Sequence, residues 1–327
     1  MRIEEHIAPG PLSIVIGGRT IALPIYFPSI SSVKTSLSPL EYLRVLVATK
    51  HSQFLISAYD LNNSNQRKRI AELATNAKNA GSIILLDSGN YESYWRSDKG
   101  WKWRDYLTAL KQFSYHLAFS FDNQLPPETF SKNILDVERR VTKTLAQVPK
   151  ASIIPILHGK LDHLPRIARG VASRLKPIMI AVPERELGNG IIQRIKTLTR
   201  IRRAVDETGE SIPIHLLGTG NPLALLLFSA FGANSFDGLE WCQTTVDHTT
   251  GLLYHFQHRE FFGHQSAFCA REDIPYAQAT LGHNLMFFGD WMHSIRSHIA
   301  GNGVDTLLHK HFSPEFLSTL SVALEER

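Results

Sequence analysis

The chain has 327 residues, of which 43% are hydrophobic and 20% charged, so a sizeable core can form and global disorder is excluded. The net charge of +5 leans mildly towards a polyanionic partner. Two cysteines, Cys242 and Cys269, are too few for a disulfide framework and fit a reducing compartment. The N-terminal residues lack a signal-peptide pattern and no apolar run approaches about 18 residues, so we expect a soluble, cytoplasmic protein without a membrane span.

Short strands open the chain, and strands then alternate with helices. Residues 12–30 predict two or three strands around a glycine turn, and Ser38, Pro39 and Glu41 mark the start of a helix. Apolar runs begin near residues 25, 54, 83, 117, 153, 178, 214 and 234, with helical segments between them. This alternation predicts parallel βαβ units in an α/β fold, and eight of them close a (β/α)₈ TIM barrel. An open doubly wound sheet is the competing architecture, and the count of eight favours the barrel.

The alternation ends with the eighth apolar run. We expect a catalytic barrel with an N-terminal β-hairpin over residues 1–241, and a His-rich segment with C-terminal helices packed on the barrel over 242–327. In the second part, residues 242–275 have no regular pattern, 278–301 predict a long helix, and 313–324 a short last one.

Polar residues follow the apolar runs where the strands are expected to end: Asp60, Asp87, Asp122, His158, Glu184 and Asp237. Active-site residues of such barrels lie at the carboxyl ends of the strands. An ion pair or a helix cap explains any one of these acids as well as a site does, but five or six at one face favour a site. Two positioned carboxylates suit chemistry at a sugar anomeric carbon, where one attacks the carbon and the other transfers a proton.

The segment YESYWRSDKGWKWRD, residues 91–105, is both aromatic and basic. It follows the third expected strand, so it lies near the barrel mouth. Two interpretations remain open: its aromatic side chains stack on nucleobases, or they pack as an ordinary surface loop.

Seven segments between about residues 20 and 300 occur in the order of known family motifs. They are IALPIYFPSISSVKTSLSPLEYL, LLDSGNYES, AFSFDN, IIPILHGK, MIAVPE, IHLLGTGNPLALLLFSAFGANSFDGLEW and LGHNLMFFGDWMHSIRSHI. The series resembles the tRNA-guanine transglycosylases, whose motifs include DSGG, a VQGG-like turn, LAVGE, a YLMGVG segment leading to MFDC, and a closing helix with HNL. No single motif is decisive, but the ordered series is specific.

The resemblance implies a role for each matching residue. Asp237 would be the nucleophile that forms a glycosyl-enzyme, and Asp87 the general acid/base. Asp122 would accept hydrogen bonds from the guanine edge, and Tyr91 and Leu217 would enclose the base. The remaining base-binding residues would be Ser88, His158, Gly159, Glu184 and Gly218. The implied reaction is base exchange without hydrolysis, with no ATP or nucleotide cofactor.

The family's structural zinc cluster, CxCxxC with a later His, is not intact here. The nearest equivalents are His264, Cys269 and His283. Zinc accepts mixed His and Cys ligands, so a zinc site is expected on these three residues, with a fourth ligand left open between His255, His258 and Asp273. Three unrelated buried side chains are the alternative.

Other departures bear on the nucleic acid. His158 replaces the Gln of the VQGG-like turn, and CQTTVDHTTG replaces the PTR segment that contacts tRNA in the family. The pattern looks most like the DNA-acting branch, which inserts bases such as 7-cyano-7-deazaguanine into DNA in the cytoplasm of bacteria or phage-infected cells. A partner protein that opens the duplex fits this interpretation.

Three alternatives to this DNA-acting enzyme remain: a divergent transglycosylase acting on tRNA, a non-catalytic nucleic-acid-binding paralogue, and a glycoside hydrolase on the same barrel. The presence of both Asp87 and Asp237 argues against the paralogue. Asp122 and the ordered motifs argue against the hydrolase.

Overall fold

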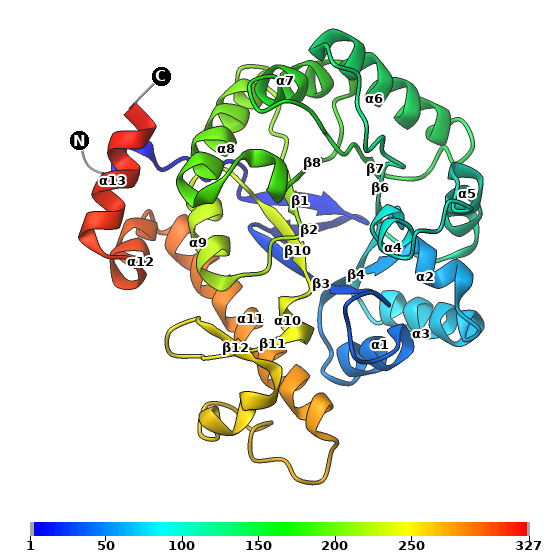
Figure 1. The fold of residues 1–327 in the computed structure, drawn as a ribbon, viewed down its shortest axis with the longest axis vertical. Helices are drawn as coiled ribbons and strands as arrows, with labels where there is room; N and C mark the ends of the chain where they lie inside the picture. The colour runs from blue at the N-terminus through cyan, green and yellow to red at the C-terminus, as the bar shows by residue number, and fades with distance from the viewer. Residues whose placement is uncertain (1–2, 326–327) are drawn as a thin grey trace.

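An eight-stranded parallel sheet forms the centre of the computed structural model, which describes residues 3–325 (Figure 1). Its strands follow one another around a ring in chain order: β3 (Ile25–Ile30), β4 (Gln53–Ser57), β5 (Ile83–Asp87), β6 (Leu117–Phe119), β7 (Ile153–Ile154), β8 (Ile180–Pro183), β9 (Ile214–Leu217) and β10 (Ser235–Gly238). β10 pairs with β3, and a parallel bridge between Ile156 and Ala181 joins the two ends of the sheet. All eight expected strands are present, and the predicted (β/α)₈ architecture is confirmed.

Helices surround this sheet and extend beyond it: α1 (Pro39–Ala48), α2 (Ala58–Asn63), α3 (Arg67–Asn79), α4 (Asn90–Trp95), α5 (Trp103–Gln112), α6 (Phe130–Leu145), α7 (Leu164–Leu175), α8 (Gly190–Asp206), α9 (Pro222–Ala230), α10 (Glu240–Gln243), α11 (Tyr276–Ala300), α12 (Val304–His311) and α13 (Pro314–Glu325). The start predicted for α1 is confirmed, because Ser38 and Glu41 form a reciprocal capping box. None of the helices in residues 3–325 is long and apolar enough to cross a membrane.

The long helix α11 completes the helical ring. It contacts α9 on one side and α1 on the other, and it also packs on β3. The Phe288 ring stacks on Tyr26 of β3 at 4.6 Å, and the Trp291 indole donates a hydrogen bond to the Pro222 carbonyl at 2.9 Å. The C-terminal segment therefore shares one core with the barrel, and α11 occupies the position of its eighth helix.

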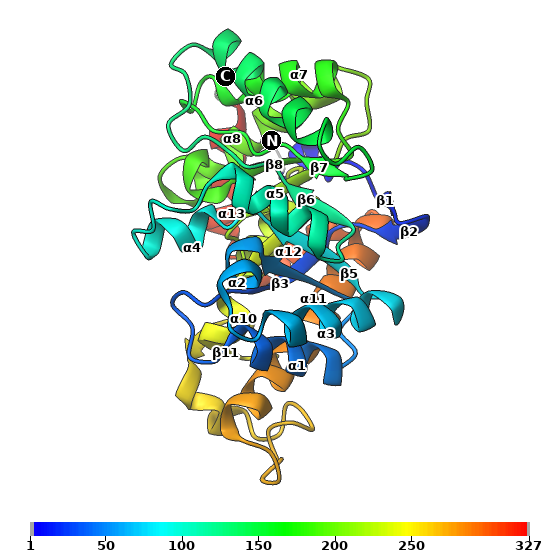
Figure 2. The ribbon, with the colours of Figure 1, turned by 90° about the vertical axis from the view of Figure 1, so that its right-hand side faces the viewer.

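Every second side chain along the strands points into the barrel interior and fills it. Its apolar cluster consists of inward-facing residues such as Phe27, Leu55, Leu85, Phe119, Ile154 and Ile156. Ile14 and Ile16 of the hairpin β1 (Ser13–Ile16) and β2 (Arg19–Ala22) belong to the same cluster and close the amino end, while α4 lies at the opposite end (Figure 2). Because side chains alternate with period two, the next inward positions carry Ser29, Asp87 and His158 at the carboxyl end.

Two segments expected to be irregular contain regular structure. Residues 91–105 are not one loop, since α4 covers the first turn and α5 begins at Trp103. Gly89 directly before α4 has φ of 83° and lies so close to Tyr59 that a Cβ atom would come within 2.7 Å of it. Residues 242–275 include the hairpin β11 (Thr244–Val246) and β12 (Leu253–His255) and a 3₁₀ helix, Phe256–Phe262.

Candidate functional site

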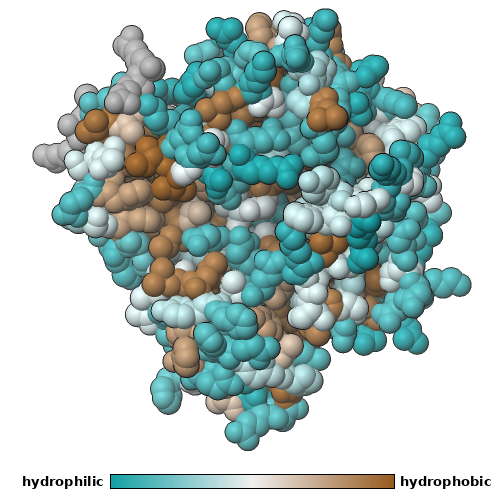
Figure 3. Space-filling view, viewed as in Figure 1, coloured by the Kyte–Doolittle hydropathy of each residue, from teal (hydrophilic) through white to brown (hydrophobic). Residues whose placement is uncertain are grey.

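A cavity of about 940 Å³ opens at the carboxyl end of the barrel. Five of the six polar strand-end residues line it: Asp87, Asp122, His158, Glu184 and Asp237. So do four of the other predicted base-binding residues, Ser88, Tyr91, Leu217 and Gly218. Figure 3, seen from the same side as Figure 1, shows that hydrophilic side chains dominate this face of the molecule. Most of the predicted site is thus brought together in one place.

The Asp237 side chain lines the cavity. Hydrogen bonds from β3, from β9 and from the loop after β9 hold its carboxylate. Ser29 Oγ donates to Oδ2 at 2.9 Å, and the Gly218 backbone N–H donates to Oδ1 at 3.1 Å. His215 Nε2 lies 3.0 Å from the same Oδ1. The side chain remains 12% exposed towards the cavity. A carboxylate held by these donors is oriented, which a nucleophile requires.

His215 is a site residue that the motif comparison missed. It is completely buried in the barrel interior, where its ring lies edge-on to Phe119 at 4.9 Å. Its Nδ1 is 2.7 Å from Ser235 Oγ. In the tautomer with hydrogen on Nε2, the ring donates to Asp237 and accepts from Ser235, which satisfies both nitrogens. The signal in the sequence is spacing: on two paired strands, His215 and Ser235 stand two residues before the cavity-lining Leu217 and Asp237.

Asp87 is the last residue of β5 and accepts a hydrogen bond from the Gly89 N–H at 2.8 Å. Removal of its carboxyl group from bulk water, together with the negative charges of Asp237 and Asp122, raises the pKa of Asp87 to about 7. A carboxyl group with this pKa can give up and take back a proton near neutral pH, which is the requirement for a general acid/base.

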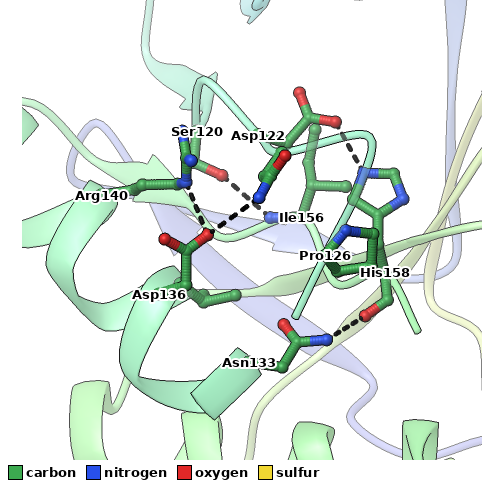
Figure 4. A pocket seen from close by; sticks show the side chains of 10 residues that line it. Ser120, Asp122, Pro126, Asn133, Asp136, Arg140, Ile156 and His158 are labelled. Atoms are coloured by element: carbon green, nitrogen blue, oxygen red, sulfur yellow. Dashed lines mark hydrogen bonds and ion pairs between the residues drawn. The ribbon is translucent and has the colours of Figure 1, made fainter. Parts of the chain in front are cut away.

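Asp122, His158 and Glu186 form a hydrogen-bonded chain, in which Asp122 and His158 are buried and Glu186 is partly exposed. Figure 4 shows the contact between Asp122 and His158. His158 Nε2 lies 2.6 Å from Asp122 Oδ2, and its Nδ1 lies 2.5 Å from Glu186 Oε1. Burial alone would lower the pKa of His158, but these two hydrogen bonds raise it to about 9. Burial alone would likewise raise the pKa of Asp122, yet the contact with His158 holds it below its usual value. His158 is therefore an imidazolium that keeps Asp122 ionised.

Two further carboxyl groups line the cavity, and motif reasoning did not find them. Glu92 is buried and accepts hydrogen bonds from Ser31 at 2.6 Å and Ser57 at 2.7 Å. Burial and the nearby Asp87 raise the pKa of Glu92 to about 8. Burial also raises the pKa of Glu240 to about 7, with Asp237 adding to the effect. Protons shared among these acids reduce charge repulsion in the cavity.

Two predicted polar residues and one predicted glycine have local partners. Asp60 does not line the cavity, and its carboxylate accepts hydrogen bonds from the N–H, at 2.7 Å, and the hydroxyl of Ser32. Gly159 also lies outside the cavity lining, and its N–H donates to Glu186 at 3.1 Å. Glu184 does line the cavity, but it pairs with Arg194 at 2.6 Å. Asp60 is therefore an ordinary paired acid, and Gly159 supports the wall from behind.

Of the expected zinc ligands, Cys269 and His283 come together and His264 does not. Cys269 Sγ lies 3.2 Å from His283 Nδ1, and Ser266 Oγ lies 3.0 Å from the same nitrogen. His283 Nε2 is held by the Val246 carbonyl at 2.7 Å. His264 is exposed. Residues 3–325 contain no group of three or more His, Cys, Asp or Glu side chains arranged to hold a metal ion. A closed zinc site needs four ligands, so these residues meet half of the requirement.

Zinc binding stays a prediction, with Cys269 and His283 as the two ligands that the structure brings together. The expected result is a stoichiometric amount of zinc in the purified wild-type protein and its loss in Cys269→Ala, measured by metal analysis. An unchanged zinc content in the variant would remove Cys269 as a ligand.

Comparison with known proteins does not assign the chain to a family. No protein-family model matches the chain, and no curated protein sequence matches it.

Proposed function

We propose that this protein is a nucleic-acid guanine transglycosylase, which exchanges guanine in DNA for a 7-deazaguanine base such as 7-cyano-7-deazaguanine. The observation that carries the proposal is that Asp87 and Asp237 line the same cavity at the carboxyl end of the barrel. The first has a pKa of about 7, and the second is oriented by three donors. The resemblance of the ordered motifs supplies the substrate class.

In the first half-reaction, an Asp237 oxygen attacks C1′ of the target nucleotide. Oδ2 accepts one hydrogen bond, from Ser29, and keeps a lone pair for this attack, whereas Oδ1 accepts two. The C1′–N9 bond breaks, and its electron pair leaves with guanine as Asp87 donates a proton to the departing base. The sugar remains attached to Asp237 as an ester.

In the second half-reaction, the incoming 7-deazaguanine replaces guanine in the same position. Its N9–H gives its proton to Asp87, and N9 attacks C1′. The ester bond to Asp237 breaks, so the carboxylate is regenerated and the proton count returns to its starting value.

Base recognition is assigned to the ionised Asp122. A carboxylate accepts hydrogen bonds from the N1–H and the amino group of guanine and of 7-deazaguanines alike, but adenine lacks this pair of donors. Asn90 Nδ2 holds Asp122 Oδ1 at 2.6 Å, opposite His158 on Oδ2. Tyr91 and Leu217 both line the cavity and supply apolar surface for the two faces of the base.

The choice of DNA depends on the resemblance to the DNA-acting branch. Where the family has its tRNA-contacting PTR segment, this chain has α10 followed by β11, with Cys242 buried and the Gln243 amide bonded to the Lys34 carbonyl at 2.9 Å. A base inside a duplex must leave the stack to enter the cavity, so the target is flipped out or presented as a single strand.

The test is a base-exchange reaction. The protein is incubated with 7-cyano-7-deazaguanine and duplex DNA, single-stranded DNA or unmodified tRNA, and each nucleic acid is digested to nucleosides for mass spectrometry. We expect the 7-deazaguanine deoxynucleoside from DNA. Product from tRNA alone would favour a divergent tRNA enzyme, and no product from any substrate would favour the non-catalytic paralogue.

A further inference from the structure

We infer that the aromatic rim formed by Tyr94 and Trp95 of α4 is a stacking platform for single-stranded DNA beside the target nucleotide. This inference rests on the proposed function for its ligand class, and it assigns a surface that the exchange reaction itself does not use. Both residues line the outer part of the cavity. The amino-end hairpin lies at the other end of the barrel (Figure 2).

The rim consists of exposed aromatic rings in mutual contact. Tyr94 is 71% exposed and Trp95 48% exposed. The two rings meet edge to face at 5.5 Å, and Trp95 meets Tyr91 in the same way at 6.3 Å. Tyr91 thus connects the rim to the base-binding cavity. Large aromatic groups left this exposed beside a binding cavity mark an interaction site.

One cation contacts the rim and two more lie next to it in the sequence or on the cavity lining, whereas acids line the cavity itself. Lys34 Nζ lies 3.3 Å above the centre of the Trp95 ring. Arg96 is exposed and held in place by the Ser32 carbonyl at 3.1 Å, and Arg185 is exposed on the cavity lining. Phosphates are attracted to the rim and repelled from the acidic interior, so a strand can run over the mouth while one base enters it.

Single-stranded DNA fits this surface better than a duplex or a protein. Bases stack on aromatic side chains only when they are unpaired, and such stacking tolerates any sequence. A cavity of about 940 Å³ lies at the upper end of the roughly 300–1,000 Å³ range that encloses whole small molecules, so it leaves room beyond one purine for the sugar and an adjacent nucleotide.

The experiment measures binding of a fluorescein-labelled single-stranded DNA of about 12 nucleotides by anisotropy, since aromatic-groove sites span about 4–16 nucleotides. The variants are Tyr94→Ala and Trp95→Ala. Phe261→Ala is the matched control, because Phe261 is 70% exposed and does not line the cavity. We expect each rim variant to raise Kd by roughly 5- to 150-fold, the equivalent of about 1–3 kcal/mol per stacked base, and the control to match wild type. Thermal unfolding verifies that all three variants are folded.

Fluorescence gives a second readout. Trp95→Phe retains an aromatic ring, so it should bind DNA with nearly wild-type Kd while losing the part of the tryptophan quenching that DNA causes in the wild type. Rim variants that bind single-stranded DNA like wild type would overturn the inference, as would an equal loss in Phe261→Ala. Binding of single-stranded RNA but not DNA through the same residues would also overturn it.

The outcomes separate this inference from the proposed function. A protein that exchanges bases but binds DNA independently of Tyr94 and Trp95 would overturn the platform and leave the activity. A protein that binds DNA through these rings but exchanges no base would overturn the activity and leave the platform.

Discussion

Asp237→Asn is expected to abolish base exchange, with a loss of about 10,000-fold or more in kcat. The amide has nearly the shape of the carboxylate but is not a nucleophile, so no bond to C1′ forms. Its oxygen can still accept from Ser29 or Gly218, and the fold should be unchanged. The measurement uses DNA without an incoming base: the wild type should accumulate a protein–DNA adduct that survives denaturing electrophoresis, and the variant none.

Asp60→Asn is the matched control for this experiment. Asp60 is 5% exposed and Asp237 9%, and both lie near the carboxyl end of a barrel strand, but Asp60 is paired with Ser32 outside the cavity. The control should form the adduct at the wild-type level, with at most a small loss of stability. Wild-type activity in Asp237→Asn would contradict the nucleophile assignment.

The sequence predicted the barrel because its strongest signals are local. Each buried parallel strand appears as a short apolar run, and helical segments separate the runs, so counting the runs was enough to predict an eight-stranded barrel. The position of α11 was not predictable in this way. It closes the ring through contacts such as that between Tyr26 and Phe288, which are far apart in the chain.

The site was partly predictable for a related reason. A residue that ends a strand lies at the barrel mouth whatever its partners are, so Asp87, Asp122, His158 and Asp237 could be placed together. Partners contributed by other strands do not stand at strand ends, and their sequence signal is only their spacing from the strand-end residues. Ser29 and His215 hold Asp237 across strand boundaries, and Asp60 shares the pattern of the site acids but turns away to a local partner.

Removal of the second carboxylate by Asp87→Asn is expected to slow exchange by about 100- to 10,000-fold and to flatten its pH dependence. The pKa of Asp87 is raised to about 7, so the carboxyl group is mostly protonated at pH 6 and mostly ionised at pH 8. Protonation of the leaving guanine needs the acid form. Adduct formation by the wild type should therefore fall about tenfold between pH 6 and pH 8, following the protonated fraction.

The second half-reaction has the opposite pH dependence, because Asp87 must then accept the proton from the incoming base. Release of the adduct by 7-cyano-7-deazaguanine should rise with pH over the same range, so complete turnover has a maximum near pH 7. Glu240→Gln is the control, since burial raises the pKa of Glu240 to a similar value and Glu240 lines the same cavity. If the opposing slopes persist in Asp87→Asn and vanish in Glu240→Gln, the proton belongs to Glu240. If they vanish only in Asp87→Asn, Asp87 is the group that protonates the leaving guanine and then accepts the proton of the incoming base. One carboxyl group then serves both half-reactions, so the exchange needs no other proton donor.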